Sequence, residues 1–186
     1  MENTRPNLLE SHIMIIIRGY PAVGKTTIGL KVRDCIGNAV CISVDNIIQM
    51  LGDFRSRQNK TMGHIASRYL ANFFMKQGMN IVIEELFADE ISIRKTIELA
   101  NQLHYNWFIF ELESTISDIK ARDKNFGRIH TQDIDRLLSI LEKKYYHEPL
   151  AIKINTSNLS METATREIVK IVESSINNIS ERQKGG

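Results

Sequence analysis

Eight residues from Gly19 to Thr26 read Gly-Tyr-Pro-Ala-Val-Gly-Lys-Thr and fit the pattern G-x-x-x-x-G-K-[ST] at every fixed position. The two glycines let the backbone bend so that successive N–H groups point inward, where phosphate oxygens fit. Lys25 would place its charge at the β- and γ-phosphates, and the Thr26 hydroxyl would coordinate Mg²⁺ beside them. The pattern therefore predicts a cradle for a nucleoside triphosphate. Its predicted contacts are Gly19, Tyr20, Pro21, Ala22, Val23, Gly24, Lys25, Thr26 and Thr27.

The alternative is a glycine-rich turn that matches by accident. At average residue frequencies, about one random chain of this length in a hundred would contain a match. A run of isoleucines precedes the motif and a helix-compatible segment follows it, and a phosphate cradle requires both. This context favours the cradle.

Asp45 directly follows a predicted strand, Val40 to Val44. In an open parallel sheet the ligand binds at the carboxyl ends of the strands. A carboxylate there could accept the proton of a substrate hydroxyl as that hydroxyl attacks the γ-phosphoryl group. Asp45 is therefore the predicted catalytic base, and the alternative is that it caps a helix beginning at Asn46.

The predicted strand Asn80 to Glu84 is apolar until it ends in two adjacent acids, Glu84 and Glu85. Successive strand residues face opposite ways, so the two carboxylates should point to different sides of the sheet. Glu84 is the predicted metal residue together with Thr26, and in that case Glu85 would point toward the acceptor pocket, but the sequence does not separate the two roles. Exchanged roles, and a Glu85 that simply faces solvent, are the alternatives.

A basic segment at residues 121–128 lies between the fourth and fifth predicted strands, and helical character breaks there at Gly127. A mobile arginine can close on the charge of a transferring phosphoryl group and exclude water. The sequence thus predicts a short lid near residues 122–130, with Arg122 and Arg128 as catalytic candidates and Arg136 as a weaker one. Solvated surface arginines are the alternative.

Two kinds of segment must position these residues. Short runs rich in Ile, Val and aromatic residues alternate with longer segments of helical periodicity, which indicates an α/β domain with a mostly parallel sheet covered on both faces. The predicted strands are Ile13 to Arg18, Val40 to Val44, Asn80 to Glu84, Trp107 to Leu112 and Leu150 to Asn155. The predicted helices are Lys25 to Ile36, Met62 to Gln77, Glu90 to Leu103, Thr115 to Asp123, Thr131 to His147 and Met161 to Ile179, the last capped by Ser160.

The second predicted helix carries an apolar stripe at helical spacing, made of Ile65, Tyr69, Leu70, Phe73 and Phe74. Stripes of this period usually bury a helix against a sheet. We predict that the stripe belongs to the core and is not a cage for a ligand.

Composition limits the class of protein. The chain has 186 residues, of which 42% are hydrophobic and 25% charged, and this suits one globular domain. We expect residues 13–179 to form that domain, between a flexible arm at 1–12 and a flexible tail at 180–186. The formal net charge of +2 is too balanced for an extended nucleic-acid-binding surface.

The cysteines, the apolar runs and the N-terminal segment indicate where the protein is expected to reside. Cys35 and Cys41 do not amount to a framework of disulfide bridges, so we expect both to be reduced. The longest apolar run, Ile13 to Ile17, is far shorter than the roughly 20 residues that cross a bilayer. Residues 1–12 lack the features of a secretory signal. A cytoplasmic protein without membrane spans is therefore expected, and its five histidines show no metal-ligand spacing.

Beyond the phosphate motif, three segments resemble the family of small bacterial P-loop kinases that includes chloramphenicol phosphotransferase, with zeta toxins and polynucleotide kinases as more distant kin. They are Val44 to Ile48, Gly78 to Phe87 and Ile154 to Ser160. The resemblance spans about residues 13–172. It implies the three-layer P-loop NTPase fold with five parallel strands in the order 2-3-1-4-5, ATP with Mg²⁺, Asp45 as the base, and a turn near the adenine that includes Thr156. Polynucleotide kinases usually have an arginine three residues after the aspartate, where Ile48 stands here.

The expected activity is ATP-dependent transfer of a γ-phosphoryl group to a hydroxyl of a small molecule. The absence of the arginine at Ile48 makes a nucleic-acid acceptor less favoured. The alternatives are a nucleotide, nucleoside or RNA 5′-hydroxyl kinase, and a nucleotide-binding regulatory module without catalysis. The sequence leaves the acceptor and the oligomeric state open.

Overall fold

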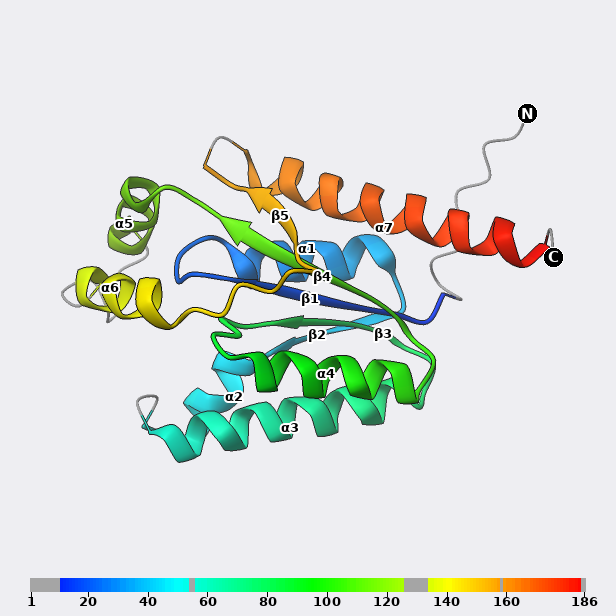
Figure 1. Ribbon diagram of the computed structural model, residues 1–186, viewed down its shortest axis with the longest axis horizontal. Coiled ribbons are helices and arrows are strands. Elements are labelled where there is room, and N and C mark those ends of the chain that lie inside the picture. The colour runs from blue at the N-terminus through cyan, green and yellow to red at the C-terminus, as the bar shows by residue number, and fades with distance from the viewer. Residues whose placement is uncertain (1–10, 54–55, 126–133, 158, 185–186) are drawn as a thin grey trace.

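The isoleucine-rich run before the phosphate motif forms the central strand of the sheet, β1 (Ile13–Gly19), in which every residue is buried. β1 pairs in parallel with β3 on one side and β4 on the other. The full order is β2-β3-β1-β4-β5, and all neighbouring strands are parallel (Figure 1). The predicted five-stranded sheet and its order are confirmed.

The computed structural model describes residues 11–53, 56–125, 134–157 and 159–184. The remaining strands are β2 (Ala39–Ser43), β3 (Asn80–Glu84), β4 (Asn106–Glu113) and β5 (Ile152–Asn155). The helices are α1 (Lys25–Ile36), α2 (Val44–Met50), α3 (Arg57–Met75), α4 (Glu90–Gln102), α5 (Ile116–Asn125), α6 (Ile134–Lys144) and α7 (Met161–Lys184). Within the described residues, no helix is both long and apolar enough to cross a bilayer.

The alternation of side chains along β1 divides the core into two halves. Ile13, Ile15 and Ile17 pack with residues of α1 and α7 on one face of the sheet. Met14 and Ile16 pack with residues of α3 and α4 on the other face. Figure 1 shows these two helical layers, with α5 and α6 beyond the carboxyl ends of the strands. The chain therefore has the predicted three-layer architecture.

Several element boundaries differ from the predicted ones. Ser56 caps α3 by accepting a hydrogen bond from the backbone N–H of Asn59, so this helix begins at Arg57 and not at Met62. The long last helix continues past Ile179 to Lys184, into the predicted tail. Of the predicted helix from Thr131, residues 134–144 are helical and residues 131–133 lie outside the described part of the chain. The predicted arm lies outside it too, except for Ser11 and His12.

The apolar stripe on α3 does not belong to the core, so that prediction is wrong. The residues of α3 that are buried are Gly63, Ser67, Ala71 and Met75. Tyr69 is 71% exposed and Phe73 is 58% exposed, and Ile65 and Leu70 are also exposed. Phe74 alone of the stripe packs partly against the core. Small side chains let the helix approach α2 and the sheet closely, and the large ones then face outward.

Gly63 is where this close approach is tightest. A Cβ atom added at Gly63 would lie 2.4 Å from Cγ1 of Ile48, a buried residue of α2. Gly63→Ala should therefore lower the free energy of unfolding by about 1 kcal/mol, because an overpacking cost of about 1–3 kcal/mol exceeds a gain in helix propensity of up to about 1 kcal/mol. Urea unfolding of the two proteins measures this difference.

Tyr69→Ala, on the exposed face of the same helix, is the matched control and should change stability by no more than about 0.5 kcal/mol. A Gly63→Ala variant as stable as the parent protein would contradict this packing of α3 on α2.

Candidate active site

The phosphate motif forms the loop between β1 and α1. Gly19 has φ 143°, and a Cβ there would lie 2.5 Å from the carbonyl oxygen of Leu112, so both backbone conformation and space require glycine. Ala22 also has a left-handed φ, 60°. α1 begins at Lys25, directly after the loop, so its N-terminal N–H groups and the loop amides form one electropositive end.

Lys25 lies across this loop. Its side chain is largely buried, and Nζ donates a hydrogen bond of 3.0 Å to the carbonyl oxygen of Tyr20. Thr26 and Thr27, in the first turn of α1, are exposed. The ammonium group and two accessible hydroxyls therefore lie at the same end of the helix.

Glu84, at the end of β3, lies on the α1 side of the sheet. The Thr26 hydroxyl donates a hydrogen bond of 3.0 Å to its Oε1, although the two residues are far apart in sequence. Glu84 is 1% exposed, and its Oε2 is buried without a hydrogen-bond partner among the described residues. An orphaned carboxylate oxygen beside a hydroxyl is a hard oxygen donor set that suits Mg²⁺. Thr26 and Glu84 thus fit the predicted metal position.

Glu85, the next residue, lies on the opposite side of the sheet. The backbone N–H of Phe87 donates to its Oε2, and Nε2 of His64 lies 3.8 Å from its Oε1. Burial raises the pKa of Glu85 to about 8, and the nearby charge of Asp45 contributes to the rise. The two acids face opposite sides of the sheet, as strand alternation predicts, with Glu84 beside Thr26 and Glu85 away from it.

Asp45 lies in the first turn of α2 and is partly exposed. The helix begins at Val44, and its cap is Ser43, whose side chain accepts a hydrogen bond from the N–H of Asn46. The alternative that Asp45 caps a helix from Asn46 is therefore wrong. Its carboxylate is free of that task and lies within electrostatic range of both Glu85 and His64.

His64 was not assigned any chemistry from the sequence. It is mostly buried on α3, and burial lowers its pKa, so the imidazole is predominantly neutral near pH 7. His64 and Glu85 are distant in sequence and share no motif. Only the packing of α3 beside the end of β3 brings them together.

Arg122 and Thr156 meet at the other end of the site. Nη2 of Arg122, on α5, donates a hydrogen bond of 2.6 Å to the carbonyl oxygen of Thr156, and Nη1 lies 3.2 Å from Oγ1. Thr156 is fully buried, and its hydroxyl also lies within 3.3 Å of the carbonyl oxygen of Val23 in the phosphate loop. Arg122 is thus held at the turn after β5, and Thr156 braces the loop. Arg128 lies outside the described residues.

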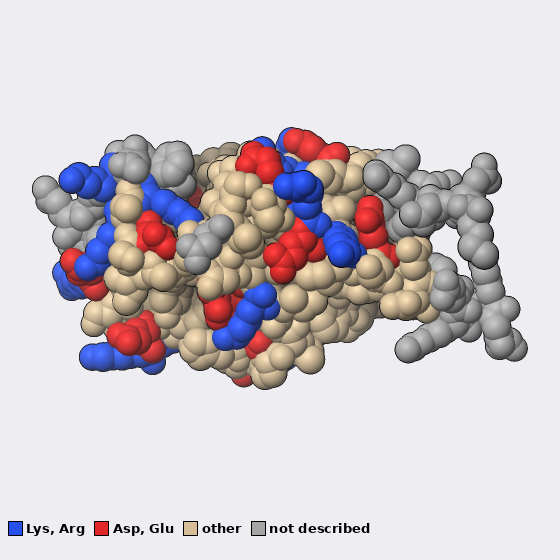
Figure 2. Space-filling model, turned by 90° about the horizontal axis from the view of Figure 1, so that it is seen from above, with Lys and Arg blue, Asp and Glu red and all other residues tan. Residues whose placement is uncertain are grey.

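The end of the molecule that carries α5 and α6 is rich in basic side chains. Figure 2 shows Lys and Arg gathered there, with acidic side chains among them. Some of these charges pair with each other, as Lys120 does with Asp135 at 2.6 Å. Arg136 is exposed on α6.

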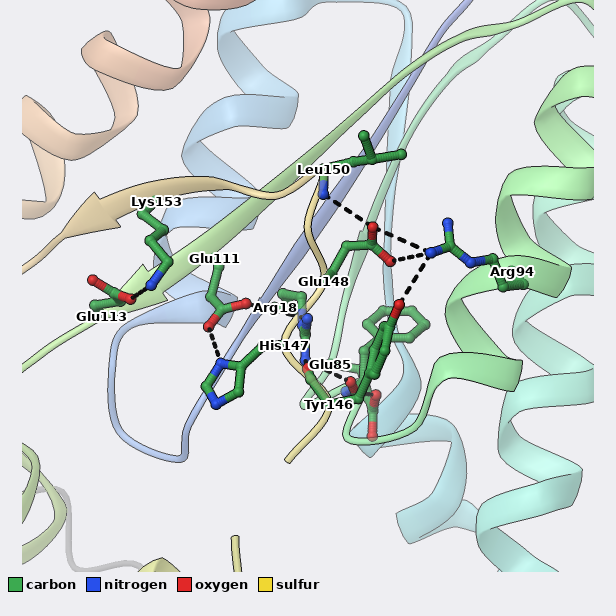
Figure 3. Close-up of polar contacts among 11 residues, drawn as sticks. Arg18, Glu85, Arg94, Glu111, Glu113, Tyr146, His147, Glu148, Leu150 and Lys153 are labelled. Carbon is green, nitrogen blue, oxygen red and sulfur yellow. Dashed lines mark hydrogen bonds and ion pairs between the residues drawn. The ribbon is translucent and has the colours of Figure 1, made fainter. Parts of the chain in front are cut away.

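Arg18 is a site residue that sequence reasoning missed. It is the residue before Gly19, it is 0% exposed, and it lies on the α3 and α4 side of the sheet beside Glu111 of β4 (Figure 3). Nη1 lies 3.1 Å from Oε2 of Glu111, and the guanidinium carbon lies 4.3 Å from the ring centre of Tyr145. The available signal was a charged residue that interrupts an apolar strand directly before the motif.

A pocket of about 360 Å³ adjoins the phosphate loop. It lies between Tyr20 and the carboxyl ends of β4 and β5. Its lining includes Glu111, Ser114, Tyr145 and Ser157. The ring of Tyr20 meets that of Tyr145 edge to face, with 4.9 Å between centroids, so the loop contacts the segment that follows α6.

Comparison with known proteins gives matches in structure alone. No family model and no curated protein matches the sequence. An APS kinase from Mycobacterium tuberculosis, solved with AMPPNP and APS, is 12% identical, with a TM-score of 0.71 over 88% of this chain and 98% of the other. A gluconokinase from Sinorhizobium meliloti 1021 is 13% identical, with a TM-score of 0.71 over 92% and 97%. The tunicamycin resistance protein of Deinococcus radiodurans is 16% identical, with a TM-score of 0.62 over 86% and 94%.

At these identities the likeness concerns the fold, and it does not single out the chloramphenicol phosphotransferase-like family. The matches cover nearly the whole of each solved chain. Together with the sheet order and the loop geometry, they establish that this chain has the three-layer α/β fold of the P-loop kinases.

Proposed function

We propose that the protein is an ATP-dependent kinase that transfers the γ-phosphoryl group to a hydroxyl of a small molecule. The observation that carries the proposal is the position of the Asp45 carboxylate. It is free of the helix cap and shares an electrostatic neighbourhood with Glu85, and Glu85 in turn lies within range of Lys25. This supports a single site with a base for the acceptor and a cation for the triphosphate.

The residues of the site divide the steps of this reaction among them. Asp45 takes the proton of the acceptor hydroxyl, whose oxygen attacks the γ-phosphorus as the bond to the β–γ bridging oxygen breaks and ADP leaves. The loop amides and Lys25 hold the β- and γ-phosphates. Thr26 and Glu84 would hold Mg²⁺, which neutralises charge on the phosphates when bound.

The basic residues of the lid serve the nucleotide end. Arg122 is held at the turn of Thr156, which also contacts the phosphate loop, and we propose that it and Arg128 stabilise the transferring charge. Thr156 acts by bracing the phosphate loop, since its side chain is buried.

Two observations support a small molecule as the acceptor. The similar structures are named APS kinase, gluconokinase and tunicamycin resistance protein, and none of these names refers to a nucleic acid. Ile48 occupies the position at which a polynucleotide kinase usually has an arginine, and it is 2% exposed in the core under α3. Both favour a small-molecule hydroxyl over a nucleic-acid end.

A label-transfer screen tests the proposal. The protein is incubated with γ-labelled ATP, Mg²⁺ and pools of metabolites, antibiotics, nucleosides and RNA 5′ ends, with the protein lacking the Asp45 carboxylate (Asp45→Asn) as control. Label in a metabolite or antibiotic pool that depends on Asp45 is the expected result. Label on nucleosides or RNA would favour the alternative kinase class. Magnesium-dependent ATP binding by calorimetry without any label transfer would favour a regulatory module.

A further inference from the structure

Arg18 is a buried cation in an otherwise apolar strand. Its guanidinium is fully buried at the carboxyl end of β1, one residue before the phosphate loop. Burying a charge is costly unless it is paired and hydrogen-bonded. The groups that contact the guanidinium must therefore compensate for the cost of burying its charge.

The partners come from three separate parts of the chain. Glu111 of β4 supplies the ion pair. Nη2 donates to the carbonyl oxygen of Phe87, at 3.0 Å, and also to that of Tyr146. Phe87 follows β3, and Tyr146 belongs to the segment that returns from α6 (Figure 3). One side chain thus joins the phosphate loop strand to both neighbouring segments.

Phe87 links Arg18 to the acceptor side of the site. Its backbone N–H donates to the Glu85 carboxylate, and its carbonyl accepts from Arg18. Its φ is 46°, a left-handed conformation that a bulky residue rarely adopts without support. The neighbouring Ala88 carbonyl accepts a further bond of 3.0 Å from the N–H of Tyr146. Phe87, whose N–H orients Glu85, is therefore held at its own carbonyl by Arg18, and the next residue is held by the returning segment.

We infer that Arg18 is a positioning residue for phosphoryl transfer, acting through the Phe87 peptide on the Glu85 carboxyl group. The inference rests on the proposed function, because it assigns Glu85 to the acceptor side of that site. Among the described residues, the contacts of Arg18 are with Phe87, Glu111, Tyr145 and Tyr146, and not with Lys25, Thr26 or Glu84. Loss of Arg18 should alter the rate of transfer and leave nucleotide affinity nearly unchanged.

Lysine cannot replace arginine here. A guanidinium presents several N–H donors in a planar fork and stacks on an aromatic face, whereas an ammonium is a compact, strongly hydrated charge. Nη2 of Arg18 donates to both carbonyls, Nη1 lies in the ion pair with Glu111, and the face of the guanidinium lies over Tyr145. Arg18→Lys keeps the charge and loses this geometry, so it isolates the positioning role.

Arg94 provides a matched control. It lies on α4 and holds the same returning segment from the solvent side, through the Tyr146 hydroxyl at 3.0 Å and Glu148 at 3.2 Å (Figure 3). None of the contacts described for it reaches Phe87. Arg94→Lys therefore loosens the segment but removes neither the bond from Arg18 to the Phe87 carbonyl nor the bond from the Phe87 N–H to Glu85.

The test is a double-mutant cycle. With the acceptor found in the label screen, Arg18→Lys should lower kcat by about 10- to 100-fold, because a misplaced group near the reacting atoms costs that much, while the Kd of Mg·ATP stays within about threefold. In a Glu85→Gln background the same substitution should cost less than about threefold, because the group it positions is already lost. Arg94→Lys should leave kcat within about threefold in both backgrounds.

Additive effects of Arg18→Lys and Glu85→Gln, or equal losses of kcat from Arg18→Lys and Arg94→Lys, would overturn the inference. If Arg18→Lys does not fold, Arg18→Met replaces it with a neutral side chain of similar length that cannot bond the Phe87 carbonyl. Its kcat should fall by the same 10- to 100-fold, and a kcat within about threefold of the parent would overturn the route through Phe87.

Hydrogen exchange separates this inference from the proposed function. Arg18→Lys should speed exchange at residues 85–88 and 145–148, whereas Arg94→Lys should speed it at 145–148 alone. If no acceptor is ever labelled, the proposed function fails. Unchanged exchange at residues 85–88 would overturn the role of Arg18 whichever acceptor is found.

Discussion

Asp45→Asn is expected to lower phosphoryl transfer by about 10²- to 10⁴-fold, the usual contribution of a positioned general base. Asn keeps the shape of the side chain and cannot take the proton of the acceptor hydroxyl. Because Ser43 caps α2 and Asp45 does not, the helix should persist in the variant. The Kd of Mg·ATP should stay within about twofold, since the carboxylate is not part of the phosphate loop. Single-turnover transfer and calorimetry measure the two quantities.

Asp34→Asn is the control for this variant, because Asp34 is an exposed carboxylate at the end of α1 that pairs with Arg33. It should transfer phosphate at the parent rate. If Asp45→Asn keeps full turnover with the labelled acceptor, Asp45 is not the base. The Glu85 carboxyl would then be the next group to substitute.

The sheet separates the site into two sides. Glu84 lies with Thr26 on the α1 side, next to the triphosphate loop, and Glu85 lies with His64 on the α3 side. Adjacent strand residues face opposite ways, so two consecutive acids can serve the nucleotide and the acceptor at once. Arg18 belongs to the second side, where its register neighbour across β4 is Glu111.

Features set by neighbouring residues were predictable from the sequence. The phosphate loop is one contiguous motif between an apolar strand and a helix, so its conformation depends on residues within a few positions of each other. The strands followed from short β-branched runs, and the separation of Glu84 from Glu85 followed from strand alternation.

Features set by distant partners were not predictable. The contacts of Arg18 with Phe87 and Tyr146 span 69 and 128 positions, and no local pattern encodes them. The apolar period of α3 shows that the helix has a face, but it cannot tell which face meets the protein. The small residues Gly63 and Ala71 decided that question by allowing close packing.

Lys25→Met is expected to have the largest effect. The ammonium group would contact the β- and γ-phosphates, and a charge-assisted hydrogen bond of about 1.5–3 kcal/mol corresponds to a loss of about 10- to 150-fold in ATP affinity. Losing a cation that stabilises the transferring group should lower turnover at saturating ATP by a further 10²- to 10³-fold or so. Calorimetry with Mg·ATP and transfer assays over a range of ATP concentration separate the two losses.

Folding should not account for the loss in Lys25→Met. Methionine fills a similar volume, and the bond lost inside the protein is that to the Tyr20 carbonyl. The matched control is Lys31→Met, which removes a partly exposed lysine of α1 that pairs with Glu162 of α7, and it should bind and transfer as the parent does. Parent-like ATP affinity in Lys25→Met, in protein that melts at the parent temperature, would mean that the loop after β1 does not hold a triphosphate. The assignment of Thr26 and Glu84 to its metal ion would then fail with it.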